Sequence, residues 1–91
     1  MIEREVEIVN RLGLHARAAA KLVQVASGFR CSIVLDKGGE EADAQSILGI
    51  LLLAAAQGTK LVVRCDGEEE ERALEAVVKL IVDGFGEETD S

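Results

Sequence analysis

The chain has 91 residues, of which 48% are hydrophobic and 30% are charged, and its formal net charge is −7. This length suits a single domain, and the hydrophobic content argues against disorder. The acidic balance argues against nonspecific nucleic-acid binding, and no apolar run approaches the roughly 18 residues of a membrane span. The first residues lack the basic and apolar regions of a signal peptide, so we expect a cytoplasmic protein without membrane insertion.

The hydrophobic pattern predicts alternating strands and helices. Alternation with a period of two indicates strands, and apolar residues spaced three and four apart indicate helices. The expected strands are residues 2–9, 31–36, 40–44 and 60–66, and the expected helices are residues 16–27, 47–53 and 69–82. A turn at residues 37–39 makes the second and third strands a hairpin. This order favours an α+β fold in which helices cover one face of an antiparallel sheet.

His15 is the only histidine, and it stands where an extended segment gives way to the first helix. A helix N-terminus offers free N–H groups and the positive end of the helix dipole, so it stabilises a negative group on the ring. Arg17 supplies a guanidinium suited to phosphate, Arg11 adds charge, and Lys21 follows one turn later on the expected solvent face. These residues indicate a phosphate site. They also leave open a histidine that only caps the helix beside scattered cations.

Residues 13–17, Gly-Leu-His-Ala-Arg, and the alanine-rich helix after them resemble the active-site motif of the histidine-containing phosphocarrier (HPr) family. Residues 45–51, Gln-Ser-Ile-Leu-Gly-Ile-Leu, resemble that family's regulatory serine segment, at the expected distance from the histidine. The resemblance covers nearly the whole chain. It implies an open-faced β-sandwich, with a four-stranded antiparallel sheet and three helices packed on one face. It also implies one domain over residues 1–91, with a flexible acidic tail from about residue 87.

The resemblance implies a phosphocarrier of the phosphoenolpyruvate-dependent phosphotransferase system. Such a protein takes phosphate onto Nδ1 of His15 from Enzyme I and passes it to an EIIA-type protein. His15 and Arg17 would carry the chemistry, and Ala16, Arg17 and Ala18 would bind the phosphate. The protein would be a stoichiometric carrier rather than an enzyme, would need no cofactor or metal, and is expected to be a monomer. The chain departs from the family at Ala18, where proline is usual, and this puts the rigidity of the helix entry in doubt.

Ser46 stands at an expected helix N-cap, and the resemblance makes it a site for an HPr kinase/phosphorylase. Gln45 departs from the lysine that often precedes this serine, and a purely structural cap is the alternative. The resemblance also implies a docking surface for partner proteins. Its expected residues are Ala20, Lys21, Gln24, Ile47, Leu48 and Leu51. The apolar pattern alone also allows the second helix to be fully buried.

Cys31 and Cys65 lack CxxC spacing, and with a single histidine they do not make an ordinary zinc site. Both fall on apolar-facing strand positions, so we expect them to be reduced core residues. The family topology would make their strands neighbours. Two further functions stay open: residues 82–85 and the acidic tail hint at the nitrogen-type regulatory paralogue, and Ala18 leaves room for a signalling module that responds to Ser46 without carrying phosphate.

Overall fold

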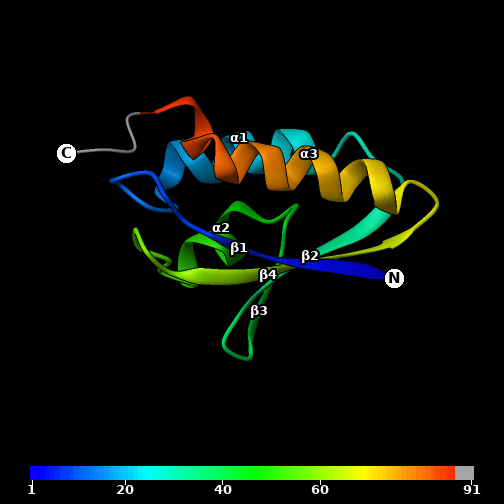
Figure 1. Ribbon diagram of the computed structural model, residues 1–91, viewed down its shortest axis with the longest axis horizontal. Coiled ribbons are helices and arrows are strands. Elements are labelled where there is room, and N and C mark those ends of the chain that lie inside the picture. Colours follow the sequence, from blue (N-terminus) through cyan, green and yellow to red (C-terminus); the bar gives the residue numbers. More distant parts are fainter. Residues whose placement is uncertain (88–91) are drawn as a thin grey trace.

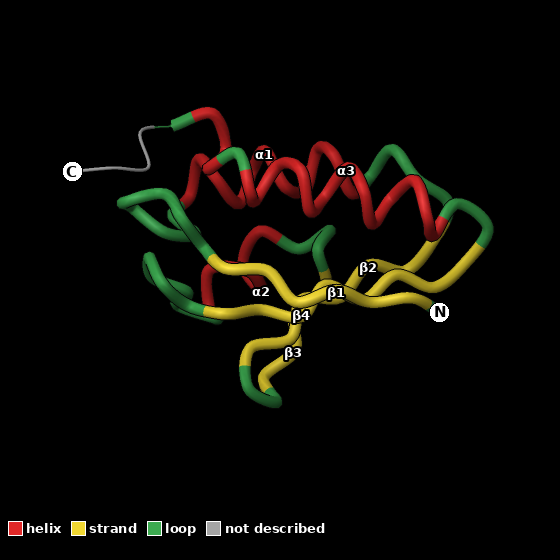
Figure 2. The backbone as a smooth tube through the Cα atoms, viewed as in Figure 1, coloured by secondary structure: helices red, strands yellow, loops and turns green. Residues whose placement is uncertain are grey.

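The computed structural model describes residues 1–87, which form a four-stranded antiparallel sheet with helices packed on it (Figures 1 and 2). The strands are β1 (Ile2–Glu7), β2 (Cys31–Lys37), β3 (Glu40–Asp43) and β4 (Lys60–Gly67). Their order in the sheet is β1-β4-β2-β3, so the two central strands come from distant parts of the sequence. All the pairings are antiparallel, and the expected fold class is confirmed.

The helices are α1 (Ala16–Ala26), α2 (Ile47–Leu52) and α3 (Glu70–Val82), and a short 3-10 turn η1 (Gly84–Gly86) follows α3. Helices α1 and α3 pack against each other over the sheet, and α2 contacts α1 and β3 (Figure 1). The expected ranges agree with these bounds to within one or two residues at each end. Within residues 1–87, no helix has the length and apolar character needed to cross a membrane.

The core is mainly aliphatic, and Phe85 is buried in it as well. In β4, alternate residues point toward the helices and are buried: Leu61, Val63 and Cys65. Helix α3 buries a stripe with helical spacing: Ala73, Leu74, Val77, Val78 and Ile81. Each large aliphatic side chain in this layer contributes about 1.5–3 kcal/mol through its removal from water. Packing between the sheet and the helices is therefore the main stabilising term.

The outer face of the sheet carries no helix in the described part of the chain, and it is polar. Arg64 of β4 lies there among carboxylates from each of the other three strands. Its guanidinium nitrogens lie 3.2 Å from Glu3, 3.3 Å from Asp36 and 3.1 Å from Glu41. This network links all four strands on the side that the helices leave open.

The turn after α3 brings the chain back to the N-terminus of α1. Phe85 is almost completely buried, although its φ of 58° is unfavourable for a residue with a side chain, by about 1–2 kcal/mol. Burial of the ring offsets that cost. The Lys21 ammonium also donates a hydrogen bond to the carbonyl oxygen of Phe85, at 2.7 Å. The turn is thereby held against α1, and Glu87 follows it directly.

Candidate functional site

The loop between β1 and α1 sets the position of His15. Gly13 has a φ of +68°, and a Cβ atom there would lie 2.5 Å from the carbonyl oxygen of Ala55. The next residue, Leu14, is buried and donates its N–H to that same oxygen at 2.9 Å. Asn10 is fully buried and donates from Nδ2 to the Gly13 carbonyl oxygen at 2.8 Å. Glycine is favoured here because a side chain would need both an unfavourable left-handed conformation and a shift of the neighbouring backbone.

His15 is the N-cap residue of α1. Its backbone is extended, with φ −79° and ψ 179°, and its Nδ1 accepts a hydrogen bond from the backbone N–H of Arg17 at 3.2 Å. The ring therefore satisfies one of the free donors of the first helical turn. His15 therefore does cap the helix, which is the alternative role that the sequence allowed. It also directs Nδ1 at the helix N-terminus, where a phosphate would be stabilised.

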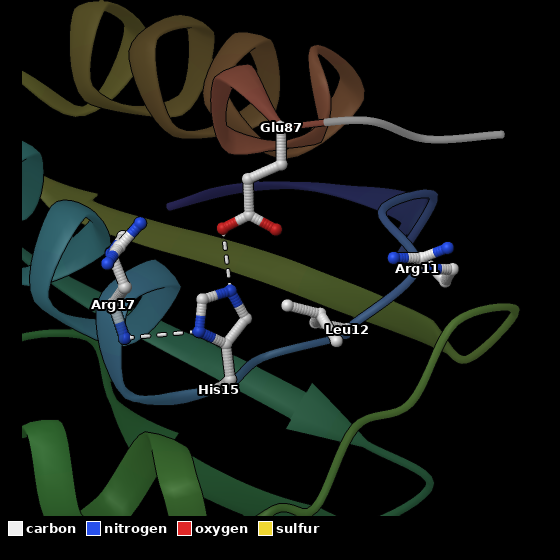
Figure 3. Close-up of a pocket in the computed structure, with 5 residues that line it drawn as sticks. All are labelled: Arg11, Leu12, His15, Arg17 and Glu87. Atoms are coloured by element: carbon white, nitrogen blue, oxygen red, sulfur yellow. Dashed lines mark hydrogen bonds and ion pairs between the residues drawn. The ribbon is translucent and has the colours of Figure 1, made fainter. Parts of the chain in front are cut away.

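Glu87 contacts the other ring nitrogen of His15. Its Oε2 lies 2.6 Å from Nε2 (Figure 3). Its Oε1 accepts a hydrogen bond from Asn10 Nδ2 at 3.1 Å. The His15 and Glu87 side chains are only 26% and 18% exposed. Glu87 begins the segment expected to be a flexible acidic tail, and residues 88–91 lie outside the described residues. Sequence reasoning missed this contact, because no local pattern links positions 72 residues apart.

The carboxylate of Glu87 is held in its charged form. Burial by itself raises the pKa of Glu87. Hydrogen bonds from Asn10 and His15, together with the positive charges of His15 and Lys21, lower it by more than burial raises it, so the pKa of Glu87 lies below its ordinary value. Glu87 is therefore ionised near neutral pH. An ionised carboxylate accepts hydrogen bonds only, so the contact requires a proton on Nε2 of His15.

A pocket surrounds this pair, lined by Arg11, Leu12, His15, Arg17 and Glu87 (Figure 3). Two of its lining residues are arginines, Arg11 and Arg17, whose guanidinium groups suit contact with a phosphate. The close-up shows Arg17 and Leu12 on different sides of the imidazole. The His15 ring is therefore partly open to solvent within this pocket.

The remaining residues expected along α1 differ in exposure. Ala16 and Gln24 are exposed, and Ala20 is half-buried. Ala18 is fully buried, so its methyl group belongs to the core and only its backbone faces the helix N-terminus. Lys21 is only partly exposed, less than an outward-facing helix position would be, because its ammonium donates a hydrogen bond to the chain after α3.

Ser46 is the N-cap of α2, and its Oγ accepts a hydrogen bond from the Gly49 N–H at 3.0 Å. Only Ile50 of this helix is fully buried, so the alternative of a wholly buried helix is wrong. Ile47 and Leu48 are exposed as expected, whereas Leu51 is half-buried. Leu52, which was not expected in the docking surface, is 71% exposed. In so short a helix the apolar spacing does not decide which leucine faces out.

The two cysteines lie on the paired strands β2 and β4, where Cys31 is opposite Gly67 and Cys65 is opposite Ile33. Cys65 is a buried core residue as expected, whereas Cys31 is only partly buried and packs against the core. Burial raises the pKa of the Cys65 thiol to about 11 and also raises that of Cys31. Both thiols are therefore protonated near neutral pH, as expected of residues that pack rather than react.

Comparison with known proteins defines the class to which this fold and site belong. Residues 2–83 match the family model described as the phosphotransferase system HPr component phosphorylation site. The phosphocarrier protein HPr of Xylella fastidiosa (strain Temecula1) is 49% identical over 89 residues, covering 98% of this chain and 100% of the relative. The phosphocarrier protein NPr of Escherichia coli (strain K12) is 41% identical, covering 96% and 98%.

Solved structures agree with this class. The crystal structure of HPr-C-His from Thermoanaerobacter tengcongensis superposes with a TM-score of 0.93 at 44% identity, covering 97% of this chain and 99% of the other. A crystal structure of an HPr dimer from the same organism gives a TM-score of 0.76, with 96% and 100% covered. This class is that of the phosphocarriers of the phosphotransferase system. The chain belongs to the HPr family.

Proposed function

We propose that this protein accepts a phosphoryl group on Nδ1 of His15 from Enzyme I and passes it to an EIIA-type protein. The observation that carries the proposal is the position of His15 at the N-cap of α1, where Nδ1 faces the first-turn N–H groups. A phosphoryl group on this nitrogen would lie at the positive end of the helix dipole. The family membership supports the same chemistry.

The two hydrogen bonds of the ring favour Nδ1 as the attacking nitrogen. Nδ1 is held by a neutral backbone N–H at 3.2 Å, and bonds of this kind contribute about 0.5–1.5 kcal/mol. Nε2 is held by a carboxylate at 2.6 Å, and bonds to charged groups contribute about 1.5–3 kcal/mol. Breaking the hydrogen bond to Nδ1 therefore costs less free energy than breaking the one to Nε2. Nε2 also carries the proton in this contact, so its lone pair is not available for attack.

Once His15 carries phosphate, the free N–H groups in the first turn of α1 become hydrogen-bond donors to the phosphoryl group. The N–H of Arg17 that caps onto Nδ1 becomes a donor to a phosphoryl oxygen, together with the neighbouring N–H of Ala18. Ala16 leaves the approach sterically open, and the Arg17 guanidinium adds a planar charged donor group. The site is partly exposed, so the donor and the acceptor reach the same nitrogen in turn. No cofactor or metal is required for such a transfer.

The test is a phosphotransfer assay with purified Enzyme I and phosphoenolpyruvate. We expect one acid-labile, base-stable phosphate per chain, and none on the His15→Ala variant. The Arg17→Ala variant should keep its stability, because Arg17 is exposed, and should accept phosphate more slowly. Full labelling of His15→Ala would refute the proposal.

The acceptor protein distinguishes the sugar branch from the nitrogen branch. The NPr relative of Escherichia coli and the resemblance of residues 82–85 favour testing the nitrogen branch alongside the sugar branch. Assays with EIIA-type domains of both kinds would show which one takes phosphate from this chain. If Enzyme I does not label the chain and neither domain takes phosphate from it, the signalling alternative is favoured instead.

Regulation and docking extend the proposal. Ser46 is proposed as the site of an HPr kinase/phosphorylase, because an N-cap accommodates a phosphate dianion. The proposed docking surface combines Ala20, Lys21 and Gln24 of α1 with Ile47, Leu48 and Leu51 of α2, and Leu52 joins it by its exposure. We propose a cytoplasmic monomer as the working form. Sedimentation analysis would distinguish it from a dimer.

A further inference from the structure

The carboxylate of Glu87 is fixed by two donors. Oε2 faces Nε2 of His15 at 2.6 Å, and Oε1 accepts from Nδ2 of Asn10 at 3.1 Å. The same Asn10 nitrogen also donates to the carbonyl oxygen of Gly13. Both groups near this nitrogen are hydrogen-bond acceptors, so the Asn10 amide must place its NH₂ group, and not its oxygen, at this position. Glu87 is therefore an acceptor toward both partners. Its carboxylate lies across the ring from Nδ1 (Figure 3).

We propose that Glu87 is a positioning residue that keeps the proton on Nε2 and balances the positive charge that the ring gains when Nδ1 carries phosphate. This inference rests on the proposed function, because it concerns the phosphorylated state of His15. It assigns a role in the transfer to a residue that follows the C-terminal turn.

The charge balance of the transfer gives Glu87 this role. When the lone pair of Nδ1 bonds to phosphorus, the bond from phosphorus to the donor breaks and its electron pair leaves with the donor. The ring keeps its Nε2 proton and becomes positively charged. A carboxylate at 2.6 Å stabilises that charge, as the aspartate does for the imidazolium of a Ser-His-Asp triad. On onward transfer the electron pair of the N–P bond returns to Nδ1, the ring becomes neutral, and the proton stays on Nε2.

The other charged groups near the ring do not stabilise a positive charge on it. Arg11 and Arg17 line the same pocket, and the charge of Lys21 acts on the Glu87 carboxylate. All three are cations, so they favour the phosphate but oppose a positive ring. Glu87 is the one acid among the described residues that line the pocket. Its removal would leave the phosphorylated ring facing positive charge alone.

The variant Glu87→Gln tests the charge at nearly constant shape, and Glu75→Gln is the matched control. Glu75 is exposed on α3 outside the pocket, so its change removes the same charge elsewhere. Each protein is phosphorylated chemically with phosphoramidate, which needs no protein donor, and its ³¹P spectrum is followed against pH. We expect phosphate on Nδ1 in the unaltered protein. The titration midpoint of the phosphorylated ring should fall by about one pH unit in Glu87→Gln and stay unchanged in Glu75→Gln.

Transfer from phosphorylated Enzyme I gives the second readout. Glu87→Gln should slow it about tenfold, less than a fully buried pair would, because the contact is partly exposed to solvent. Glu87→Asp should restore part of the midpoint shift, because it restores the charge on a shorter side chain. Equal ³¹P midpoints in the unaltered protein and Glu87→Gln would overturn the role of Glu87. Chemical labelling without labelling by Enzyme I would instead overturn the proposed function, and the midpoints would still decide the role of Glu87.

Discussion

Substitution of Gly13 offers a direct test of how the loop holds His15, and Gly38 provides the matched control. Both glycines have a positive φ, +68° and +57°. A Cβ atom at Gly38 meets nothing within 4 Å, whereas at Gly13 it would lie 2.5 Å from the Ala55 carbonyl oxygen and 3.0 Å from the Ala56 Cα. Alanine at Gly38 is therefore destabilising only through its left-handed backbone conformation. Alanine at Gly13 has the same conformational cost and must also push the loop away from the backbone of Ala55 and Ala56.

The expected magnitudes follow from these contacts. The left-handed conformation costs an alanine about 1–2 kcal/mol in both variants. Displacement of packed backbone at Gly13 adds about 1–3 kcal/mol, by analogy with overpacked cores. For a domain of this size, 1 kcal/mol shifts the melting temperature by about 4–8 °C. Gly13→Ala should therefore melt at least about 4 °C below Gly38→Ala.

The assay is thermal or urea denaturation of both variants, followed by circular dichroism, together with their phosphorylation by Enzyme I. Gly13→Ala should also lose transfer rate, because the same loop carries His15. Gly38→Ala, in the hairpin between β2 and β3, should not. Equal stabilities of the two variants would refute the claim that a close backbone approach at Gly13 fixes the loop.

Four further outcomes are expected. Ala18→Pro should raise stability by about 0.4–1 kcal/mol in thermal denaturation, because proline suits a first helical turn; a loss would show that this fully buried position cannot hold the ring. Ser46→Ala should cost about 1 kcal/mol of stability through loss of the cap to the Gly49 N–H. Ser46→Asp should slow labelling of His15 by Enzyme I, because it places a negative charge beside the proposed docking residues Ile47 and Leu48; an unchanged rate would contradict regulation through Ser46. Because the pKa of Glu87 lies below its ordinary value of 4.5, its contribution to stability is complete above that pH and is lost as pH falls through the lowered value. Urea titrations at several pH values should therefore show Glu87→Gln less stable than the unaltered protein near neutral pH and equal to it in acid.

The sequence predicted the elements well because each depends on local periodicity. The stripe of α3 and the cap at Ser46 are both properties of a few neighbouring residues, and both are confirmed. The position of His15 at the start of α1 was predictable for the same reason. In each case the signal lies within one turn or one strand of the residue concerned.

The parts that escaped prediction depend on contacts between distant segments. Glu87 reaches His15 because the buried Phe85 turns the chain back, and Lys21 is partly buried by its hydrogen bond to a carbonyl oxygen of that same turn. A charged residue in an acidic tail is usually solvated, so no pattern in residues 82–91 marks Glu87 as part of the site. The fold must be known before these contacts can be seen.

The turn at Phe85 has a practical consequence for handling the protein. Because Glu87 contacts His15, a tag or label attached directly after Glu87 would lie close to the reactive ring. The N-terminal ammonium pairs instead with Glu70, at the start of α3, and Figure 1 shows the N-terminus at the far end of the molecule from the start of α1. Fusions, fluorophores and surface attachment are therefore better placed at Met1, where they leave the approach to the imidazole open to partner proteins.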